Sequence, residues 1–260
     1  MDAQRKDIVR SADTTLAVLE AIAFAEEALG VTQIAQRLSL SKGAIFRHLQ
    51  SLVDRGFVAQ DPQTSRYRLG VKASLIGRLA PPENDLIAAA EGPMRDIRDR
   101  TAITTVLSAP TTSGALVLNT VIGYRTIEIG VRKGSELPFH ASAQGKVMLA
   151  FGPPALMERT LRLGLPPLTP HTITDPDRLV SEVNLIRENG VATAPEEALL
   201  GINTLAAPVF DRDSRLAGAV ALCGSIQYLP ANPDDGLFAM VREMASRISR
   251  TLGYGTRAGN

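Results

Sequence analysis

Residues 31–69 read VTQIAQRLSLSKGAIFRHLQSLVDRGFVAQDPQTSRYRL. Apolar residues recur at helical spacing after Thr32 and again after Ser41, which predicts two short amphipathic helices joined by a tight turn. A β-hairpin over residues 57–69 follows, with the polar turn DPQTS between its strands. This order of elements is that of a winged helix-turn-helix, a module that reads DNA.

Capping residues and arginines indicate how this module would meet DNA. Thr32 and Ser41 are the predicted N-caps of the two helices, and Gly56 suits a left-handed end of the second. The N-terminal half of that second helix is the part that would enter the major groove. Arg66 and Arg68 share one face of the returning strand, where they would meet phosphate or the minor groove. The predicted DNA contacts are Ser41, Lys42, Gly43, Ala44, Phe46, Arg47, Arg66 and Arg68.

The charge balance gives this interpretation modest support. Residues 1–80 carry 11 lysines and arginines against 8 acidic residues, a net charge of +3, whereas the rest of the chain carries −2. So small an excess predicts weak, salt-sensitive binding by a single copy and favours two copies on a palindrome. Two amphipathic helices with a hairpin also occur in protein-interaction modules, so that alternative stays open.

Composition narrows the class of protein. A chain of 260 residues, 45% hydrophobic and 21% charged, indicates a globular protein of one or two domains. Cys223 is the only cysteine, so no internal disulfide can form, and a cytoplasmic location is expected. The N-terminus lacks the apolar core of a signal peptide, and no apolar run has the length of a bilayer span. We therefore expect no membrane partner.

The chain divides near Pro81-Pro82, where proline ends a short predicted helix because it lacks an amide donor. Beyond this break, strand and helix periodicities alternate, and four or more strands stand in hairpin-like order with flanking helices. This pattern favours an α+β domain around an antiparallel sheet. The predicted domains are 1–70 (winged helix-turn-helix), 71–83 (linker helix and Pro-Pro break) and 84–255. The predicted strands of the last are 103–108, 115–122, 125–131, 205–210 and 216–224.

Several motifs add a family resemblance. The most specific is PFHASAQGKVMLA at residues 138–150, and Ser41-Lys42, Tyr67 to Gly70 and Ala206 to Val209 are others. Over nearly its whole length the chain resembles the IclR family of bacterial transcriptional regulators. The resemblance implies a C-terminal effector-binding domain similar to GAF and PAS sensor folds. It also implies a homodimer, often a tetramer, that binds palindromic operator DNA.

The segment ASAQG at residues 141–145 opens a predicted helix and supplies an effector site on independent grounds. The first N–H groups of a helix have no intrahelical partner and, with the helix dipole, form an anion site. Small residues let a ligand approach this backbone closely. A carboxylate is the simplest ligand, and in the family these groups take an acidic effector. Carried over from the family, the pocket positions are Ile129, Leu137, Ala143, Gln144, Ala194, Ile202, Thr204, Ala221 and Cys223.

This pocket departs from that of members that bind very small oxo-acids. Those members tend to hold a carboxylate at the position of Ala194, hydroxyls at Ala221 and Cys223, and a thiol at Thr204. The more apolar set in this chain favours a larger, less polar small organic acid, such as an aromatic carboxylate.

Other reactive residue types favour structural roles. His140 stands two residues before Ser142, poor spacing for a catalytic pair, so we expect a structural hydrogen bond. Glu196 and Glu197 predict a solvated turn, and Lys146 could meet an anion or form a surface salt bridge. Scattered histidines and a single cysteine give no metal-ligand spacing. We expect no catalytic residue, metal or cofactor. Two alternatives remain: a protein-interaction adaptor, and a small-molecule enzyme with a regulatory module.

Overall fold

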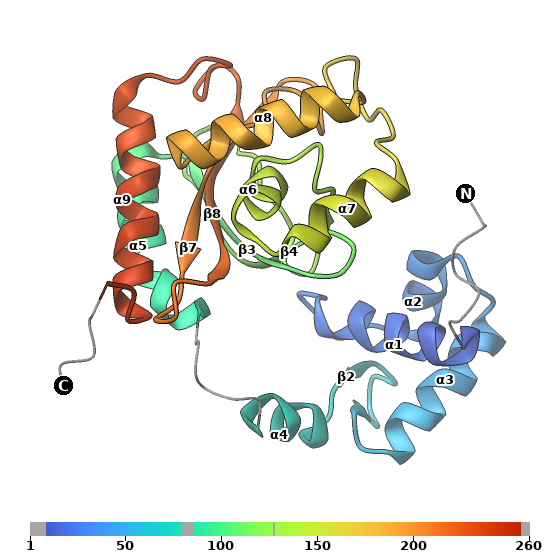
Figure 1. Cartoon of the computed structure of the whole chain (residues 1–260). Helices are drawn as coiled ribbons and strands as arrows, with labels where there is room; N and C mark the ends of the chain where they lie inside the picture. Colours follow the sequence, from blue (N-terminus) through green and yellow to red (C-terminus); the bar gives the residue numbers. More distant parts are fainter. Residues whose placement is uncertain (1–8, 80–85, 127, 256–260) are drawn as a thin grey trace. The chain divides into compact units, whose positions relative to one another are not determined.

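The computed structural model describes residues 9–79, 86–126 and 128–255. The chain divides into two compact units, residues 1–83 and 84–260 (Figure 1). The expected break at Pro81-Pro82 lies outside the described residues. No helix in the described part of the chain has both the length and the apolar character needed to cross a bilayer.

The first unit is a winged helix-turn-helix followed by one more helix. Its elements are α1 (Arg10–Ala23), α2 (Val31–Leu38), α3 (Lys42–Asp54), β1 (Val58–Gln60), β2 (Tyr67–Leu69) and α4 (Val71–Leu79). The strands β1 and β2 pair antiparallel, with Ala59 opposite Arg68. The buried core joins α1, α2, α3 and the hairpin through Val18, Ile22, Leu29, Ile34, Ala35, Ile45, Leu49, Leu52, Val58 and Tyr67.

Local interactions at the helix ends explain the shape of this unit. The Ser41 hydroxyl accepts a hydrogen bond from the Ala44 N–H at 3.2 Å, so the predicted N-cap of α3 is confirmed. Gly56 has a φ of +76°, as the end of that helix requires. The prediction of Thr32 as the N-cap of α2 is wrong. Gly30 occupies that position, and its N–H donates to Oε1 of Gln33 at 2.9 Å.

The second unit is an α+β domain. Its helices are α5 (Leu86–Thr101), α6 (Ala143–Phe151), α7 (Pro154–Leu163), α8 (Pro176–Asn189) and α9 (Asp235–Thr251). Its strands are β3 (Thr104–Pro110), β4 (Ala115–Val121), β5 (Glu136–Leu137), β6 (Ala192–Thr193), β7 (Ile202–Phe210) and β8 (Leu216–Ser225). They form an antiparallel sheet in the order β5-β4-β3-β8-β7-β6.

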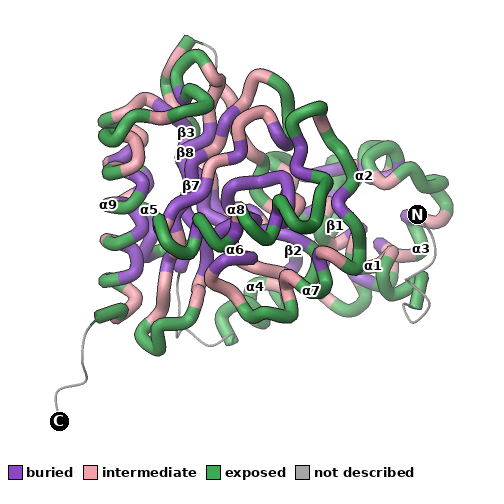
Figure 2. The backbone as a smooth tube through the Cα atoms, turned by 45° about the horizontal axis from the view of Figure 1, so that its top comes forward, coloured by how far each residue is buried: buried purple, intermediate pink, exposed green. Residues whose placement is uncertain are grey.

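Helices cover both faces of this sheet (Figure 1). One face packs against α5 and α9 through a core that includes Leu107, Leu205 and Leu222. The other packs against α6 and α8 through Ala206, Ala219 and Ala221. The helix α6 lies inside the second layer, and Figure 2 shows it buried along its length.

The predicted strand over 125–131 is wrong in its described residues, which form an irregular loop. The outer partner of β4 is β5, with Leu137 opposite Ala115. Hydrogen bonds from side chains, rather than backbone pairing with a strand, hold this loop in place. The Thr120 hydroxyl donates to the Val131 carbonyl at 2.6 Å, and the Thr104 hydroxyl donates to Glu128 at 3.2 Å.

Candidate functional site

The N-terminal half of α3 presents the face that the sequence assigns to DNA. Ile45 and Leu49 turn into the core, whereas Lys42, Phe46 and Arg47 are exposed. Ser41 and Gly43 are also exposed, and Ala44 is half-buried. Phe46 keeps 49% of its surface in solvent.

The wing arginines are exposed but differ in their surroundings. The Arg66 guanidinium donates to the Ala28 carbonyl at 3.1 Å and lies 3.9 Å from the Glu27 carboxylate. Arg68 is exposed and contributes to lowering the pKa of Asp61, although hydrogen bonds from the Thr64 and Gln63 backbones are the larger causes. Of the two, Arg68 is the freer to meet a phosphate.

The helix whose start the sequence assigns to an anion is α6, which begins at Ala143. The Ser142 hydroxyl caps the helix by accepting from the Gly145 N–H at 3.1 Å. The N–H groups of Ala143 and Gln144 are the first two of the helix and have no intrahelical acceptor. A Cβ on Gly145 would lie 2.5 Å from the Phe139 backbone, so only glycine lets the helix pack this closely on the preceding loop.

Aligned strands gather the other predicted pocket residues on the face that α6 covers. Cys223 lies opposite both Thr104 and Thr204, and Ala221 lies opposite Val106. Cross-strand neighbours share a face, so these residues form two adjacent rows. The Ala194 N–H donates to the Thr204 carbonyl at 3.0 Å, which places Ala194 at the end of the first row.

The remaining predicted effector residues pack on an apolar part of the sheet, here called the wall. Ile129, Leu137 and Ile202 pack against the cluster of Val106, Val117 and Cys223. Leu137 also packs on the neighbouring cluster that contains Ala143, Ala194 and Ala221. Burial raises the pKa of the Cys223 thiol, and a hydrogen bond with Thr204 only partly offsets this. Cys223 is therefore a neutral part of the wall and has none of the thiolate character of a redox sensor.

A buried ion pair braces α6 beside this wall. The Lys146 ammonium lies 2.5 Å from Oε1 of Glu197 and donates to the Thr193 carbonyl at 3.2 Å. Glu182 is the second carboxylate near it, at 3.7 Å. The expectations of a surface salt bridge for Lys146 and of a solvated Glu197 are both wrong. Burial raises the pKa of Glu197, against the opposing effect of Lys146.

His140 is structural, as predicted. Its Nε2 lies 3.0 Å from the Pro166 carbonyl, and Ser142 bonds to Pro138 and Gly145. Burial, followed by the neighbouring charge of Lys146, lowers the pKa of His140, although the hydrogen bond to Pro166 acts the other way. Among the described residues no group of three or more His, Cys, Asp or Glu side chains is arranged to hold a metal ion.

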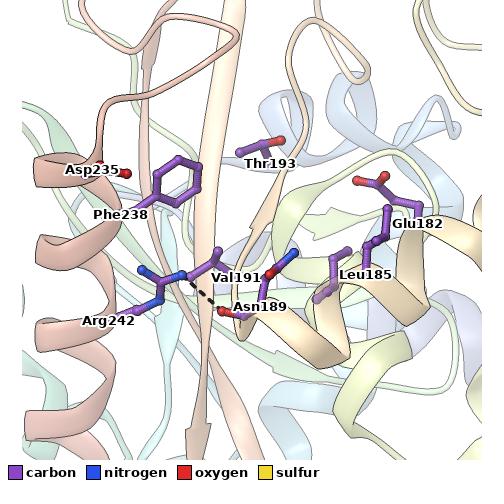
Figure 3. Close-up of a pocket in the computed structure, with 9 residues that line it drawn as sticks. Glu182, Leu185, Asn189, Val191, Thr193, Asp235, Phe238 and Arg242 are labelled. Atoms are coloured by element: carbon purple, nitrogen blue, oxygen red, sulfur yellow. Dashed lines mark hydrogen bonds between the residues drawn. The ribbon is translucent and has the colours of Figure 1, made fainter.

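A groove of about 380 Å³ opens elsewhere on the second unit, between α8, β6 and α9 (Figure 3). Its walls carry the carboxylates of Glu182 and Asp235 and the guanidinium of Arg242, which donates to the Asn189 carbonyl at 3.1 Å. The groove is poorly suited to an acid, because two carboxylates line it and its one guanidinium already donates to Asn189. None of the nine predicted pocket residues lines this groove or a smaller cavity of about 190 Å³ beside His140.

The two units together define a class of protein: a DNA-binding regulator with a separate ligand-binding domain. A family model for the IclR helix-turn-helix domain matches residues 11–62, and one for the bacterial transcriptional regulator IclR C-terminal domain matches residues 81–250. The chain belongs to the IclR family of bacterial transcriptional regulators.

Relatives match along nearly the whole chain. The glycerol operon regulatory protein of Streptomyces griseus is 32% identical over 95% of this chain and 98% of its own length. The regulator KdgR of Dickeya chrysanthemi is 29% identical over 96% of this chain and 82% of its own. The crystal structure of an IclR regulator from Alicyclobacillus acidocaldarius has a TM-score of 0.72 at 26% identity, covering 94% of this chain and 98% of that one.

Proposed function

We propose that this regulator binds operator DNA through the N-terminal half of α3 and that an apolar organic acid, such as an aromatic carboxylate, controls that binding. The contacts would come from Ser41, Lys42, Gly43, Ala44, Phe46 and Arg47, with Arg66 and Arg68 at the wing. The protein would act in the cytoplasm, where its DNA partner lies.

The proposal of an organic-acid effector rests on the first turn of α6. Its first two N–H groups, on Ala143 and Gln144, have no intrahelical acceptor and offer hydrogen bonds and a positive dipole end to a carboxylate. The wall around them contains Ile129, Ile202 and Cys223 and offers little to a second charge. An acid with a sizeable apolar body matches both properties, whereas a very small oxo-acid would leave the wall without a partner.

A homodimer would present two copies of α3 to the half-sites of a palindrome. Exposed apolar side chains on α4 support this proposal: Val71, Leu75, Ile76 and Leu79 keep between 50% and 83% of their surface in solvent. An effector would act by changing how well the paired α3 helices match the half-site spacing.

Thermal-shift screening followed by fluorescence anisotropy tests this function. Benzoate and related acids should raise the melting temperature and change the affinity for the promoter DNA. Stabilisation without an effect on DNA binding would contradict control by the acid. DNA-independent capture of a protein partner would favour the adaptor alternative, and turnover of a bound acid would favour the enzyme.

A further inference from the structure

Two polar side chains beside α6 are buried without a hydrogen-bond partner in the described part of the chain. Gln144 is 1% exposed, and neither its Oε1 nor its Nε2 is bonded. Ser108 is fully buried, and its hydroxyl oxygen is likewise unpaired. Buried polar groups are almost always hydrogen-bonded, because an unpaired one loses its hydration without replacement. Their presence on a candidate ligand site needs a physical reason.

Ser108 lies on the face of the sheet that α6 covers. It stands opposite Ala219 on β8 and opposite Val117 on β4. Ala219 packs in the cluster of α6, and cross-strand neighbours share a face. The hydroxyl therefore points into the layer between the sheet and α6.

Gln144 lies on the flank of α6 that faces the same strands. Residues two apart on a helix point about 200° apart, so Gln144 is nearly opposite Lys146. Lys146 reaches the Thr193 carbonyl on the edge strand β6. Gln144 is thus turned away from β6, toward β3 and β4, where Val106 and Val117 offer it no hydrogen bond.

The run of α6 along the sheet puts this amide beside the anion site. The Phe151 ring, at the C-terminal end of α6, packs edge-on against the Phe210 ring at 5.6 Å. Phe210 ends β7, so the first turn of α6 points toward the opposite end of β7, where Ile202 and Thr204 begin the strand. The Gln144 amide and the unpaired N–H groups therefore open on the same wall.

We propose that Gln144 determines effector specificity by binding a second polar group of the ligand. This inference rests on the proposed function, in which the N–H groups of Ala143 and Gln144 hold the carboxylate. The effector is then an apolar acid that also carries a hydroxyl or an amide, since Oε1 needs a donor and Nε2 needs an acceptor. Ser108 supplies a further hydrogen bond to the same group. A site built this way discriminates strongly against an analogue without that group.

Calorimetric titration of the full chain with benzoate, its three monohydroxy derivatives and the corresponding methoxy acids tests this inference. At least one hydroxybenzoate should bind tenfold or more tightly than benzoate, and its methyl ether should lose the gain. Gln144→Met should abolish this preference among the acids. Gln227→Met, at an exposed residue of the same unit, is the matched control.

The outcomes separate the two levels of the proposal. If no acid of the series binds, the effector clause of the proposed function fails and this inference fails with it. If the acids bind equally, or if Gln144→Met keeps the preference, only this inference fails, and the amide is then satisfied by ordered water.

A measurement without ligand tests the unpaired amide itself. Gln144→Met removes two unpaired buried polar atoms, so the melting temperature of the effector-free protein should rise by about 2–4 °C. A lower or unchanged melting temperature would show that the amide is paired inside the protein and would overturn the inference.

Discussion

The Nζ atom of Lys146 lies 2.5 Å from Oε1 of Glu197, and both side chains are buried. The pair joins α6 to the loop between β6 and β7. Thr172 holds the same loop, because its hydroxyl donates to the Glu197 carbonyl at 2.7 Å. Predicted effector residues stand on both joined segments, Gln144 on α6 and Ala194 at the start of the loop. The ion pair therefore sets the spacing between two segments that carry proposed effector residues.

Replacing one member of this pair should be costly. Lys146→Met leaves the Glu197 carboxylate buried and uncompensated, so we expect a loss of about 3–5 kcal/mol in unfolding free energy. Urea denaturation at pH 7 measures it. The double variant Lys146→Met with Glu197→Leu should recover most of the loss, because no buried charge remains. A single variant as stable as the wild type would refute this account of the pair.

His140 should make the protein less stable in mild acid. The pKa of His140 is lowered in the folded protein. As the pH falls through about 6.5, the unfolded chain therefore binds a proton at this residue that the folded chain does not bind. Stability is therefore full above that pH and declines below it, with a slope of at most about 1.4 kcal/mol per pH unit. The raised pKa of Glu197 has the opposite effect on the pH dependence of stability. The contribution of His140 is therefore measured by comparing the wild type with a variant changed only at His140.

His140→Asn should flatten this decline between pH 7.5 and 5.5 in denaturation curves measured at several pH values. Gln227→Asn, at an exposed residue that does not titrate, serves as the control and should leave the curve as it is in the wild type. Parallel curves for all three proteins would show that His140 does not titrate differently on folding.

The parts of this account that the sequence predicted are those with a local cause. Ser41 was recognisable as an N-cap because a hydroxyl stands just before an apolar-periodic run. Gly56 and the helix start at residues 141–145 are equally local signals. Thr32 misled the prediction because the helix is capped two residues earlier, where the Gly30 N–H donates to the Gln33 side chain.

Contacts between residues far apart in the sequence could not be predicted from local sequence patterns. Lys146 and Glu197 are 51 residues apart, so nothing near either residue announces a buried partner. The sequence over 125–131 alternates like a strand, but β5 occupies the edge that such a strand would have used. The unpaired Gln144 amide was equally invisible, because its surroundings exist only after α6 is placed on the sheet.

Gly145 should be irreplaceable for effector binding. A Cβ there would lie 2.5 Å from Phe139 backbone atoms and 2.7 Å from the Pro138 carbonyl oxygen, so α6 must move. Gly145→Ala should lower the melting temperature and abolish stabilisation by benzoate in a thermal-shift assay. The matched change Gly43→Ala, in an open helical position of α3, should stabilise the protein by up to about 1 kcal/mol. Retained acid binding by Gly145→Ala would contradict the packing argument.

The apolar face of α4 should hold the dimer together. Leu75→Asp places a charge on a side chain that is 55% exposed in the single chain, so the protomer should fold normally. Light scattering after size exclusion should then report a monomer, and the affinity for a palindromic operator should fall at least tenfold. A dimer of unchanged stability would show that α4 is not the interface. Ser74→Asp, at an exposed residue of the same helix, introduces the same charge and is the control.

The exposed start of α3 is the central claim, and fluorescence anisotropy with the protein's own promoter DNA tests it most directly. The wild type should prefer that DNA to a scrambled duplex and lose affinity steeply with added salt. Arg47→Ala should weaken binding by about tenfold or more at an unchanged melting temperature, because one base or phosphate contact is lost. Arg55→Ala, at the far end of α3, should bind much like the wild type. Salt-insensitive binding without sequence preference, or full affinity in Arg47→Ala, would contradict the assignment of α3 as the DNA-reading helix.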